Sequence, residues 1–425
     1  MFLKHLRIED VRSIAEAEIG MDDGDGGVRK WTLLLGENGA GKSTVLRCIA
    51  LLLCGRDALP ELLGPEPSEW IRTKCSTARV SGIVSSENGA EREVQLELHR
   101  GEGISRTLDR NARSLASLET DLEDAGRNCF VAGYGASRRL GRAGIGPYEP
   151  GTGRVGRVRT LFNADAALMP LISWAMDLEY SKGESALEVI RSALATLLRD
   201  VTFRHIDRNR KTMIFDTPDG PVSLADLSDG YQNVAAWVGD LLFRATAALD
   251  DASNPLAAPG LLLIDEIDLH LHVKWQRRLR TFLEDKLPKF QIVATTHSPM
   301  TAQQAGSGEV HVLARATPGG SPALRRYAGA PDQLGLHQII EPFFDVDTVD
   351  SDRIATLKDE YRSLAAKTRK STPEAHRLED LREQLADAPE WNGGSEAKAQ
   401  FEAPSPSLHT KASIRSGSGG RCRAS

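Results

Sequence analysis

Eight residues near the start of the chain have the types and spacing of a phosphate-binding loop, and they read GENGAGKS from Gly36 to Ser43. Glycines let backbone N–H groups wrap around phosphate oxygens, the lysine reaches the terminal phosphates, and the serine hydroxyl can bind Mg²⁺. A glycine-rich turn is the alternative, but an apolar strand before the loop and a helix after it favour phosphate binding. We assign the phosphate contacts to Gly36, Asn38, Gly39, Gly41, Lys42, Ser43 and Thr44.

Two adjacent carboxylates, Asp265 and Glu266, end the apolar run 261–264. An Asp at the end of such a strand can hold Mg²⁺ together with Ser43, and the next Glu can polarise an attacking water as a catalytic base. Acids also cap helices, so the pair means little without the loop upstream. With that loop present, the pair indicates phosphoryl transfer to water.

His297 lies in the sequence TTHSP, directly after a second apolar run at 292–294. A histidine at a strand end is more often structural than catalytic. Its place one strand after the acidic pair favours a catalytic role in sensing a terminal phosphate.

The sequence LSDGYQ, residues 227–232, is predicted to begin a helix. Ser228 and Gly230, with the N–H groups of the helix start, would suit a second phosphate contact. The simpler interpretation is that Ser228 or Asp229 caps the helix. The two roles are compatible.

The rest of the pattern gives the elements that must position these residues. Apolar periodicity predicts strands at 3–8, 31–35, 261–264 and 292–294, helices at 43–53, 161–180 and 186–198, and a helix after residue 230. Hairpins are predicted around Asn88-Gly89 and around Pro218-Asp219-Gly220. Residues 134–160, rich in Gly and Arg, are expected to be a loop or an extended segment.

The sequence divides into three expected parts. Residues 1–337 would form the phosphate-binding head, with a helical insertion at about 160–200. Two apolar stripes predict a helical hairpin within 338–390; they consist of Ile354, Leu357, Tyr361 and Leu364, and of Leu378, Leu381 and Leu385. Residues 391–425, rich in Ser, Gly, Ala and Pro, are expected to be disordered.

Composition narrows the class of protein further. The net charge of −6 gives no overall attraction to nucleic acid. Five cysteines without a CxxC pair indicate a reducing compartment with neither a disulfide framework nor a zinc site. No apolar run is long enough to span a bilayer and the first residues do not resemble a secretory signal, so we expect a cytoplasmic protein without membrane contact.

The four motifs, in this order, resemble the ABC-type ATPase heads of the structural-maintenance-of-chromosomes, RecF and RecN-like class. GENGAGKS is similar to the Walker A motif, LSDGYQN to the signature, LLLIDE to Walker B and TTHSP to the switch histidine. The resemblance implies an α/β P-loop NTPase fold with a mixed β lobe, and an enzyme that hydrolyses ATP with Mg²⁺. It also implies a homodimer, or a higher oligomer, in which the signature of one copy covers the ATP of the other.

Within that class, FVAGYGASRRL, LSDGYQNVAAWVGDLL and DEIDLHLH look like the small prokaryotic ATPases of anti-phage defence, the Septu type among them, and like AAA-labelled relatives described as virulence-linked. Three positions depart from the class pattern. Asp229 replaces a usual glycine, and His272 lies where longer members have the D-loop Asp. No Q-loop glutamine is identifiable: Gln95 resembles a strand residue, and the region of 133–135 is the candidate for that role.

Two functions remain open. The first is a switch or motor ATPase that controls a separate effector nuclease in anti-phage defence, because no TOPRIM, HNH or zinc-finger spacing points to a nuclease within this chain. The second is a RecF-like DNA-repair ATPase that binds DNA directly. Its phosphate contacts would come from Arg138, Arg139, Arg142, Arg154, Arg157 and Arg159. A solvated arginine-rich loop or an inter-subunit contact is the simpler and favoured interpretation of these residues. The opening sequence LKHLRIEDVRSI argues against a third function, a transporter subunit.

Overall fold

The computed structural model describes residues 1–24, 26–85, 89–124, 130–140, 153–198, 201–248, 255–315, 317, 319–346 and 350–386. At its centre lies a six-stranded sheet in the order β15-β14-β3-β13-β12-β6. Its strands are β3 (Trp31–Gly36), β6 (Phe130–Tyr134), β12 (Gly260–Ile264), β13 (Phe290–Thr295), β14 (Val310–Arg315) and β15 (Pro322–Tyr327). Every pair is parallel except β14–β15. The expected α/β P-loop fold is therefore confirmed.

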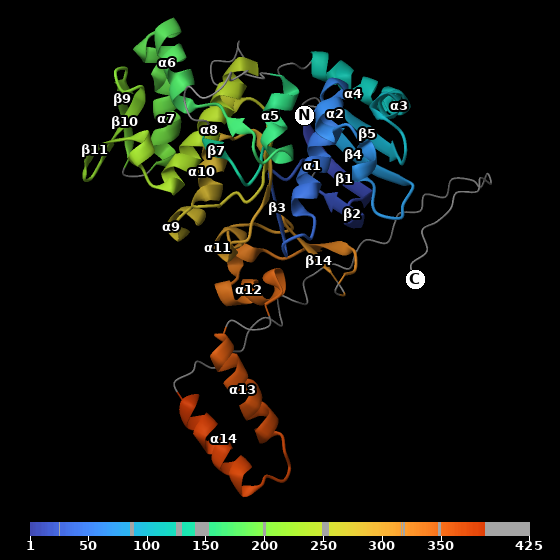
Figure 1. Ribbon diagram of the computed structural model, residues 1–425, viewed down its shortest axis with the longest axis vertical. Helices are drawn as coiled ribbons and strands as arrows, with labels where there is room; N and C mark the ends of the chain where they lie inside the picture. The colour runs from blue at the N-terminus through green and yellow to red at the C-terminus, as the bar shows by residue number, and fades with distance from the viewer. Residues whose placement is uncertain are drawn as a thin grey trace, which may run out of the picture.

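Both faces of this sheet are buried, which explains why its strands read as apolar runs. On one face, Leu34 and Leu263 pack with α1 (Lys42–Leu53) and the β lobe. On the other face, Leu33 and Leu262 pack with the helices of the insertion and with α8 (Asp229–Ala248). Figure 1 shows the sheet between these two layers. A strand held on both faces has little freedom to move, so the residues at its end are fixed.

The β lobe is an antiparallel sheet in the order β2-β1-β4-β5. It comprises β1 (Phe2–Val11), β2 (Ile14–Gly20), β4 (Thr77–Ser85) and β5 (Glu91–His99). The predicted opening strand and first hairpin are confirmed, although part of the turn between β4 and β5 falls outside the described residues.

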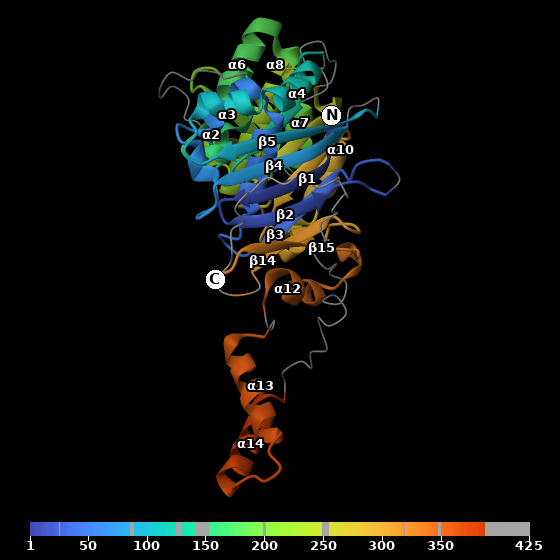
Figure 2. The same ribbon diagram turned by 90° about the vertical axis from the view of Figure 1, so that its right-hand side faces the viewer.

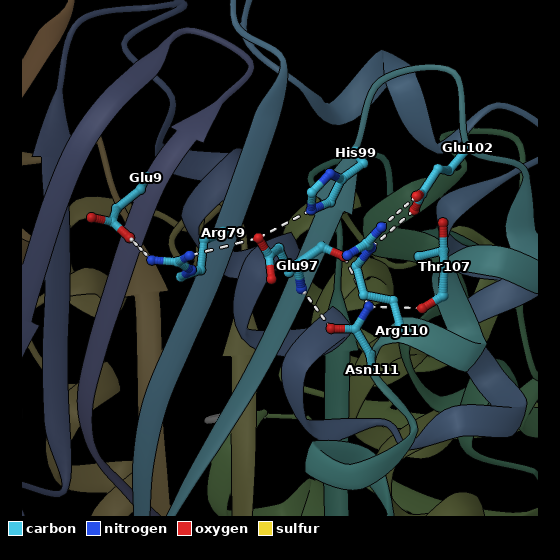
Figure 3. A network of polar contacts seen from close by, with 8 residues as sticks. All are labelled: Glu9, Arg79, Glu97, His99, Glu102, Thr107, Arg110 and Asn111. Atoms are coloured by element: carbon cyan, nitrogen blue, oxygen red, sulfur yellow. Dashed lines mark hydrogen bonds and ion pairs between the residues drawn. The ribbon is translucent and has the colours of Figure 1, made fainter. Parts of the chain in front are cut away.

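The edge strand β5 is covered by α3 (Ile104–Arg110) and α4 (Ala112–Asp124). Asn111, at the junction of the two helices, accepts a hydrogen bond from the N–H of Glu97 at 2.7 Å and donates to its carbonyl at 2.8 Å. Ser114 accepts from the N–H of Gln95 at 2.7 Å. On the same sheet, Arg79 lies between Glu9 and Glu97 (Figure 3). Side chains thus satisfy edge donors that would otherwise be free to pair with another strand.

The insertion contains α5 (Arg154–Phe162), α6 (Leu171–Lys182) and α7 (Glu188–Leu197), followed by β9 (Thr202–Asp207), β10 (Thr212–Thr217) and β11 (Gly220–Ser223). Two expectations were wrong here. The expected loop 134–160 already contains the start of α5, and the expected helix 161–180 is broken between α5 and α6. Val158 and Leu161 are buried in the core, so packing rather than composition makes α5 a helix.

After the sheet, α12 (Leu336–Phe344) packs onto the head, where the ring centroids of Phe343 and Tyr327 lie 4.8 Å apart. Next, α13 (Asp352–Ala365) and α14 (Thr372–Gln384) form the predicted helical hairpin, held partly by an Arg377–Glu360 ion pair of 2.7 Å. The hairpin stands apart from the head in both views (Figures 1 and 2). The expected disordered tail, 391–425, lies outside the described residues.

Short elements complete the described chain. They are α2 (Leu59–Leu63), β7 (Arg139–Leu140), β8 (Ala167–Leu168), α9 (Val273–Gln276), α10 (Leu279–Lys286), α11 (Pro299–Ala302) and the 3₁₀ turns Arg56–Ala58, Pro67–Trp70, Glu184–Leu187, Leu224–Asp226, Pro255–Ala257 and Pro331–Gln333. Of the helices described, none has the length and apolar character needed to cross a membrane.

The buried ring of His311 on β14 gives a prediction about acid stability. Its side chain is 1% exposed, and burial, followed by the nearby charges of Arg326 and Arg29, lowers its pKa to about 3. The unfolded chain takes up this proton near pH 6.5, whereas the folded protein resists it. Stability should therefore be complete above about pH 6.5 and decline as the pH falls toward 3. His311→Leu should flatten that decline, measured as the urea midpoint between pH 7.5 and 5.

His205→Leu, at an exposed position of β9, is the matched control and should leave the decline unchanged. An equal loss of stability on acidification in the wild type and in His311→Leu would contradict the prediction.

Candidate nucleotide site

The phosphate-binding loop joins β3 to α1 at the carboxyl edge of the central sheet. Lys42 is buried, and its Nζ lies inside the loop, donating to the carbonyl oxygens of Gly36 at 2.7 Å and Glu37 at 2.9 Å. Burial lowers the pKa of Lys42, while Asp265, Glu266 and Glu37 act in the opposite direction. The loop is therefore curled around the ammonium group of Lys42.

Backbone geometry explains two of the loop glycines. Gly36 has φ 138°, and a Cβ there would collide with the carbonyl oxygen of Leu313 on the neighbouring strand. Gly41 has φ 105° and caps α1, and a Cβ there would lie 3.1 Å from Ile14, the first residue of β2. Other residues are strained at such angles. The loop can keep this shape only with glycine at both positions.

Thr295, the last residue of β13, ties the acidic pair together. Its Oγ1 donates to Asp265 Oδ1 at 2.6 Å and accepts from the N–H of Glu266 at 2.7 Å. Asp265 is 9% exposed, and Glu266 has a left-handed φ of 48°. A non-glycine residue in this region is strained, and such strain often occurs at functional sites. The carboxylates are thus held at the end of β12, next to the phosphate loop.

His297 follows β13 and is exposed. Partial desolvation, and then the positive charge of Lys42, lower its pKa, while Glu266, Asp268 and Asp265 oppose the shift. A neutral imidazole can both donate and accept a hydrogen bond. The structure therefore places this histidine within electrostatic reach of Lys42 and the acids.

Asp268 belongs to this site but was missed in the sequence. It is buried, and its Oδ2 accepts hydrogen bonds from the hydroxyls of Thr296 and, at 2.6 Å, Thr301, which flank His297 in the chain. Ser298 extends the link by donating to Gln276 Oε1 of α9 at 2.7 Å. The sequence did contain a signal for this contact: hydroxyl residues cluster around His297, and an acid lies three residues after Asp265. Only the fold shows that they meet.

The signature lies at the start of α8, where Ser228 is exposed. A Cβ on Gly230 would lie 2.7 Å from the carbonyl oxygen of His270, itself in a left-handed turn with φ 65°. The signature is therefore packed against the segment that follows Walker B in the same chain. Among the described residues, the backbone carbonyl of Ser228 accepts from the N–H of Gln232 in α8, and no hydrogen bond joins Ser228 to the phosphate loop of its own chain.

Most of the described arginines that were candidates for DNA contact are buried, paired with acids or packed on a ring. Arg138 is only 2% exposed. Arg154 pairs with Glu119 at 2.9 Å, and Arg159 pairs with Glu61 at 3.1 Å. Arg157 lies over the ring of Phe130, 5.1 Å from its centroid. The side chains of Arg139 and Arg142 lie outside the described parts of the chain. For Arg138, the alternative of a solvated loop was wrong, because its side chain is buried and donates to the carbonyl oxygen of Glu266.

A cavity of about 580 Å³ lies next to α1 and the turn between β1 and β2, and it was also missed in the sequence. Arg12 and Arg47 line it, and the guanidinium of Arg12 lies 3.9 Å from the centre of the Trp70 ring. The turn that carries Arg12 also packs against Gly41 through Ile14. The volume of this cavity is in the range of small-molecule binding sites.

These features together define a P-loop nucleotide-binding ATPase domain. A Walker A loop follows β3, an acidic pair follows β12, and a histidine follows β13, which lies between those two strands in the sheet. Comparisons with known proteins agree. Residues 5–125 match the family model described as "AAA domain", and residues 176–301 match "AAA domain, putative AbiEii toxin, Type IV TA system". Two parts of the chain are thus similar to AAA-type ATPase domains, and each match covers less than half of its length.

Its curated relatives include "Septu protein PtuA" of Bacillus mycoides (strain KBAB4), 28% identical over 73% of this chain and 40% of the relative. "Retron Ec83 probable ATPase" of Escherichia coli is 28% identical over 47% of this chain and 36% of the relative. "Retron Vc95 probable ATPase" of Vibrio cholerae serotype O1 biovar El Tor is 32% identical over 30% and 25%, respectively. The chain is a distant homologue of these ATPases and matches less than half of the length of each.

Among solved structures, the SMC head domain from Thermotoga maritima is 18% identical, with a TM-score of 0.42, over 76% of this chain and 98% of that one. An SmcHead bound to the C-winged helix domain of ScpA is 15% identical, with a TM-score of 0.44, over 77% and 98%.

The close contact at Gly230 yields a prediction. Gly→Ala in a helix usually stabilises by up to about 1 kcal/mol, but here the new methyl must displace the His270 turn. Gly230→Ala should instead destabilise by about 1–3 kcal/mol, as overpacking does. Urea unfolding would measure it. Gly103→Ala, where a Cβ meets open space, is the control and should change stability by less than about 1 kcal/mol. A Gly230→Ala protein as stable as the wild type would show that signature and turn are not in tight contact.

Proposed function

We propose that this protein hydrolyses ATP to ADP and phosphate in a homodimer, and that this cycle controls a separate effector nuclease in anti-phage defence. The observation that carries the proposal is the arrangement around Thr295, which holds Asp265 and Glu266 beside the phosphate loop. That arrangement suits attack of water on a terminal phosphate.

Each group has a role in this chemistry. Lys42 and the loop amides bind the β- and γ-phosphates. Glu266 accepts a proton from water as the water oxygen bonds to the γ-phosphorus and the bond to the β-phosphate oxygen breaks. His297 contacts the γ-phosphate and stabilises the charge that develops there. The cavity lined by Arg12 and Trp70 has room for the purine base.

Ser43 and Asp265 present the hard oxygen donors that Mg²⁺ prefers, and the Thr295 hydrogen bond fixes one Asp265 oxygen. We therefore assign the metal to these two residues. When bound, Mg²⁺ would neutralise phosphate charge in the transition state.

The dimer follows from the exposed signature. Ser228 and the helix start of α8 offer donors for a phosphate, yet Ser228 is not bonded to the loop of its own chain in the described structure. A second copy could supply the missing phosphate to this surface. ATP would then lie between the Walker A loop of one protomer and the signature of the other.

The effector is proposed from the relatives and from the helical hairpin. The homologues are named for Septu and retron systems, which we place in anti-phage defence by the resemblance given above. The α13–α14 hairpin stands clear of the head, and only Leu381 of its stripes is fully buried. A half-buried apolar face of this kind suits a protein partner.

Direct DNA binding is the second candidate function, but the structure gives it less support. Arg138 is buried, while Arg154 and Arg159 are paired with acids. Salt-dependent DNA binding by the isolated protein would favour it.

The dimer model predicts that Glu266→Gln traps an ATP-bound dimer. Loss of a positioned base slows hydrolysis by ~10²- to 10⁴-fold, while the contacts of Lys42 and Ser43 with ATP persist. Light scattering should show a mass that doubles with ATP. Adding Ser228→Arg should abolish the doubling, because the bulky side chain fills the space against the opposite ATP.

Lys42→Ala in the same background is the control, since it should bind ATP poorly and remain unchanged in mass. For a dimer that forms without ATP, the test is a crosslink between Ser228→Cys and Asn38→Cys on opposite protomers, which should form only with ATP. A crosslink that forms equally with and without ATP would contradict the dimer model. A double variant that still doubles in mass with ATP would contradict it as well.

The effector proposal predicts that removal of residues 350–425 abolishes assembly with a nuclease encoded beside this chain. Partner contacts through the hairpin would be lost, whereas the nucleotide site lies entirely in the head. Co-purification after joint expression measures assembly, and ATP affinity, which should stay within about threefold, checks the head. Removal of residues 391–425 alone is the control and should change neither. Normal assembly by the longer deletion would exclude the hairpin as the docking surface.

A further inference from the structure

Arg138 lies where the chain leaves β6 at the edge of the sheet that carries the catalytic acids. Strand β6 pairs in parallel with β12, with Tyr134 opposite Ile264. The N–H of Asp265 donates to the carbonyl of Tyr134 at 2.8 Å, which holds the two strand ends together. The segment from Gly135 to Arg138 therefore emerges beside Asp265 and Glu266.

The guanidinium of Arg138 is buried but only partly satisfied. Its side chain is 2% exposed, and its Nη2 donates to the carbonyl oxygen of Glu266. Its Nε and Nη1 have no hydrogen-bond acceptor among the described residues. A buried donor without an acceptor destabilises a protein, so most buried donors are paired. Two such donors on one cation indicate a ligand that accepts from them.

The charges around Arg138 indicate the kind of ligand. Burial lowers the pKa of Arg138 to about 10, against the attraction of Asp265, Asp268 and Glu266, so it remains a cation at neutral pH. Within the described chain, no carboxylate lies in ion-pair distance of it. Two of these acids, Asp265 and Glu266, also act on Lys42 and His297. Arg138 thus shares these two carboxylates with the groups assigned to the terminal phosphate.

We propose that Arg138 is a catalytic residue that donates from Nε and Nη1 to the γ-phosphoryl group of ATP bound in the same chain. This inference rests on the ATPase function proposed above. Arginine suits the task because its planar fork donates two hydrogen bonds to one phosphate. Its third contact, to the carbonyl of Glu266, connects the presence of a γ-phosphate to the strained turn of the catalytic base.

The assignment accounts for the missing Q-loop glutamine. The strand next to Walker B is followed here by GASRR rather than by a glutamine. A glutamine amide could hold the Glu266 carbonyl, but it would bring no charge to the phosphate. Arg138 can do both, and it differs in this from a residue that only braces the backbone.

The experiment compares ATP with ADP in the Glu266→Gln background, where ATP is not consumed. Arg138→Gln should weaken the binding of Mg²⁺-ATP by ~10- to 100-fold, as expected for lost charge-assisted hydrogen bonds, and leave Mg²⁺-ADP within about threefold. With Glu266 intact, Arg138→Ala should lower kcat by ~10²- to 10³-fold. Millimolar guanidinium should restore part of that activity by entering the space that the side chain leaves.

Arg204→Ala, at an exposed position of β9, is the matched control and should alter neither nucleotide affinity nor the response to guanidinium. Arg138→Lys keeps the positive charge and replaces Arg138→Gln and Arg138→Ala in the test if those variants do not fold. It should bind ATP more weakly than the wild type does, with unchanged affinity for ADP. Equal losses for ATP and ADP in a folded variant, or a wild-type kcat in Arg138→Ala, would overturn the assignment. Absence of ATP binding by the wild type would instead refute the proposed ATPase function itself.

Discussion

Thr295 Oγ1 makes the hydrogen bonds on which the nucleotide site depends, because it reaches from one parallel strand to two groups of the next. It fixes the Asp265 carboxylate and the N–H of Glu266 together. This is feasible only in the register where Ala294 pairs with Ile264 and Thr295 with Leu34. A shift of one residue would turn the side chains to the other face of the sheet. The register therefore decides where phosphate, metal and water can meet.

The surrounding layers exist to hold that register. The central strands are covered on both faces. Their apolar side chains pack against α1 and the β lobe on one face, and against α8 and the insertion on the other. Tight backbone approaches add to this constraint, since Gly36 lies against the carbonyl of Leu313 and Gly230 against that of His270. The second contact joins the signature to the segment after Walker B. In the proposed dimer, this contact would connect the segment that follows the acidic pair to the surface that meets the second protomer.

The relation to Septu and retron ATPases places this head among proteins whose chains are longer than the matched part. The shared portion includes the P-loop and the strands that carry the acids. Outside it, the α13–α14 hairpin is joined to the head through α12, which is itself packed on the core. Under the proposed function, nucleotide chemistry and partner contacts would be carried by separate parts of the chain.

The sequence alone determined the P-loop, the acidic pair, the histidine and the strands that precede them, because each depends on local periodicity and on chemistry within a few residues. It also gave the two hairpin helices, whose apolar stripes are regular. The tertiary structure alone decided the environment of Arg138, which composition placed in a solvated loop and packing placed against Glu266. It likewise brought Asp268 to Thr301 and made a helix of the arginine-rich start of α5. Such contacts join residues far apart in the chain, and neither periodicity nor spacing carries information about which distant groups will share a buried space.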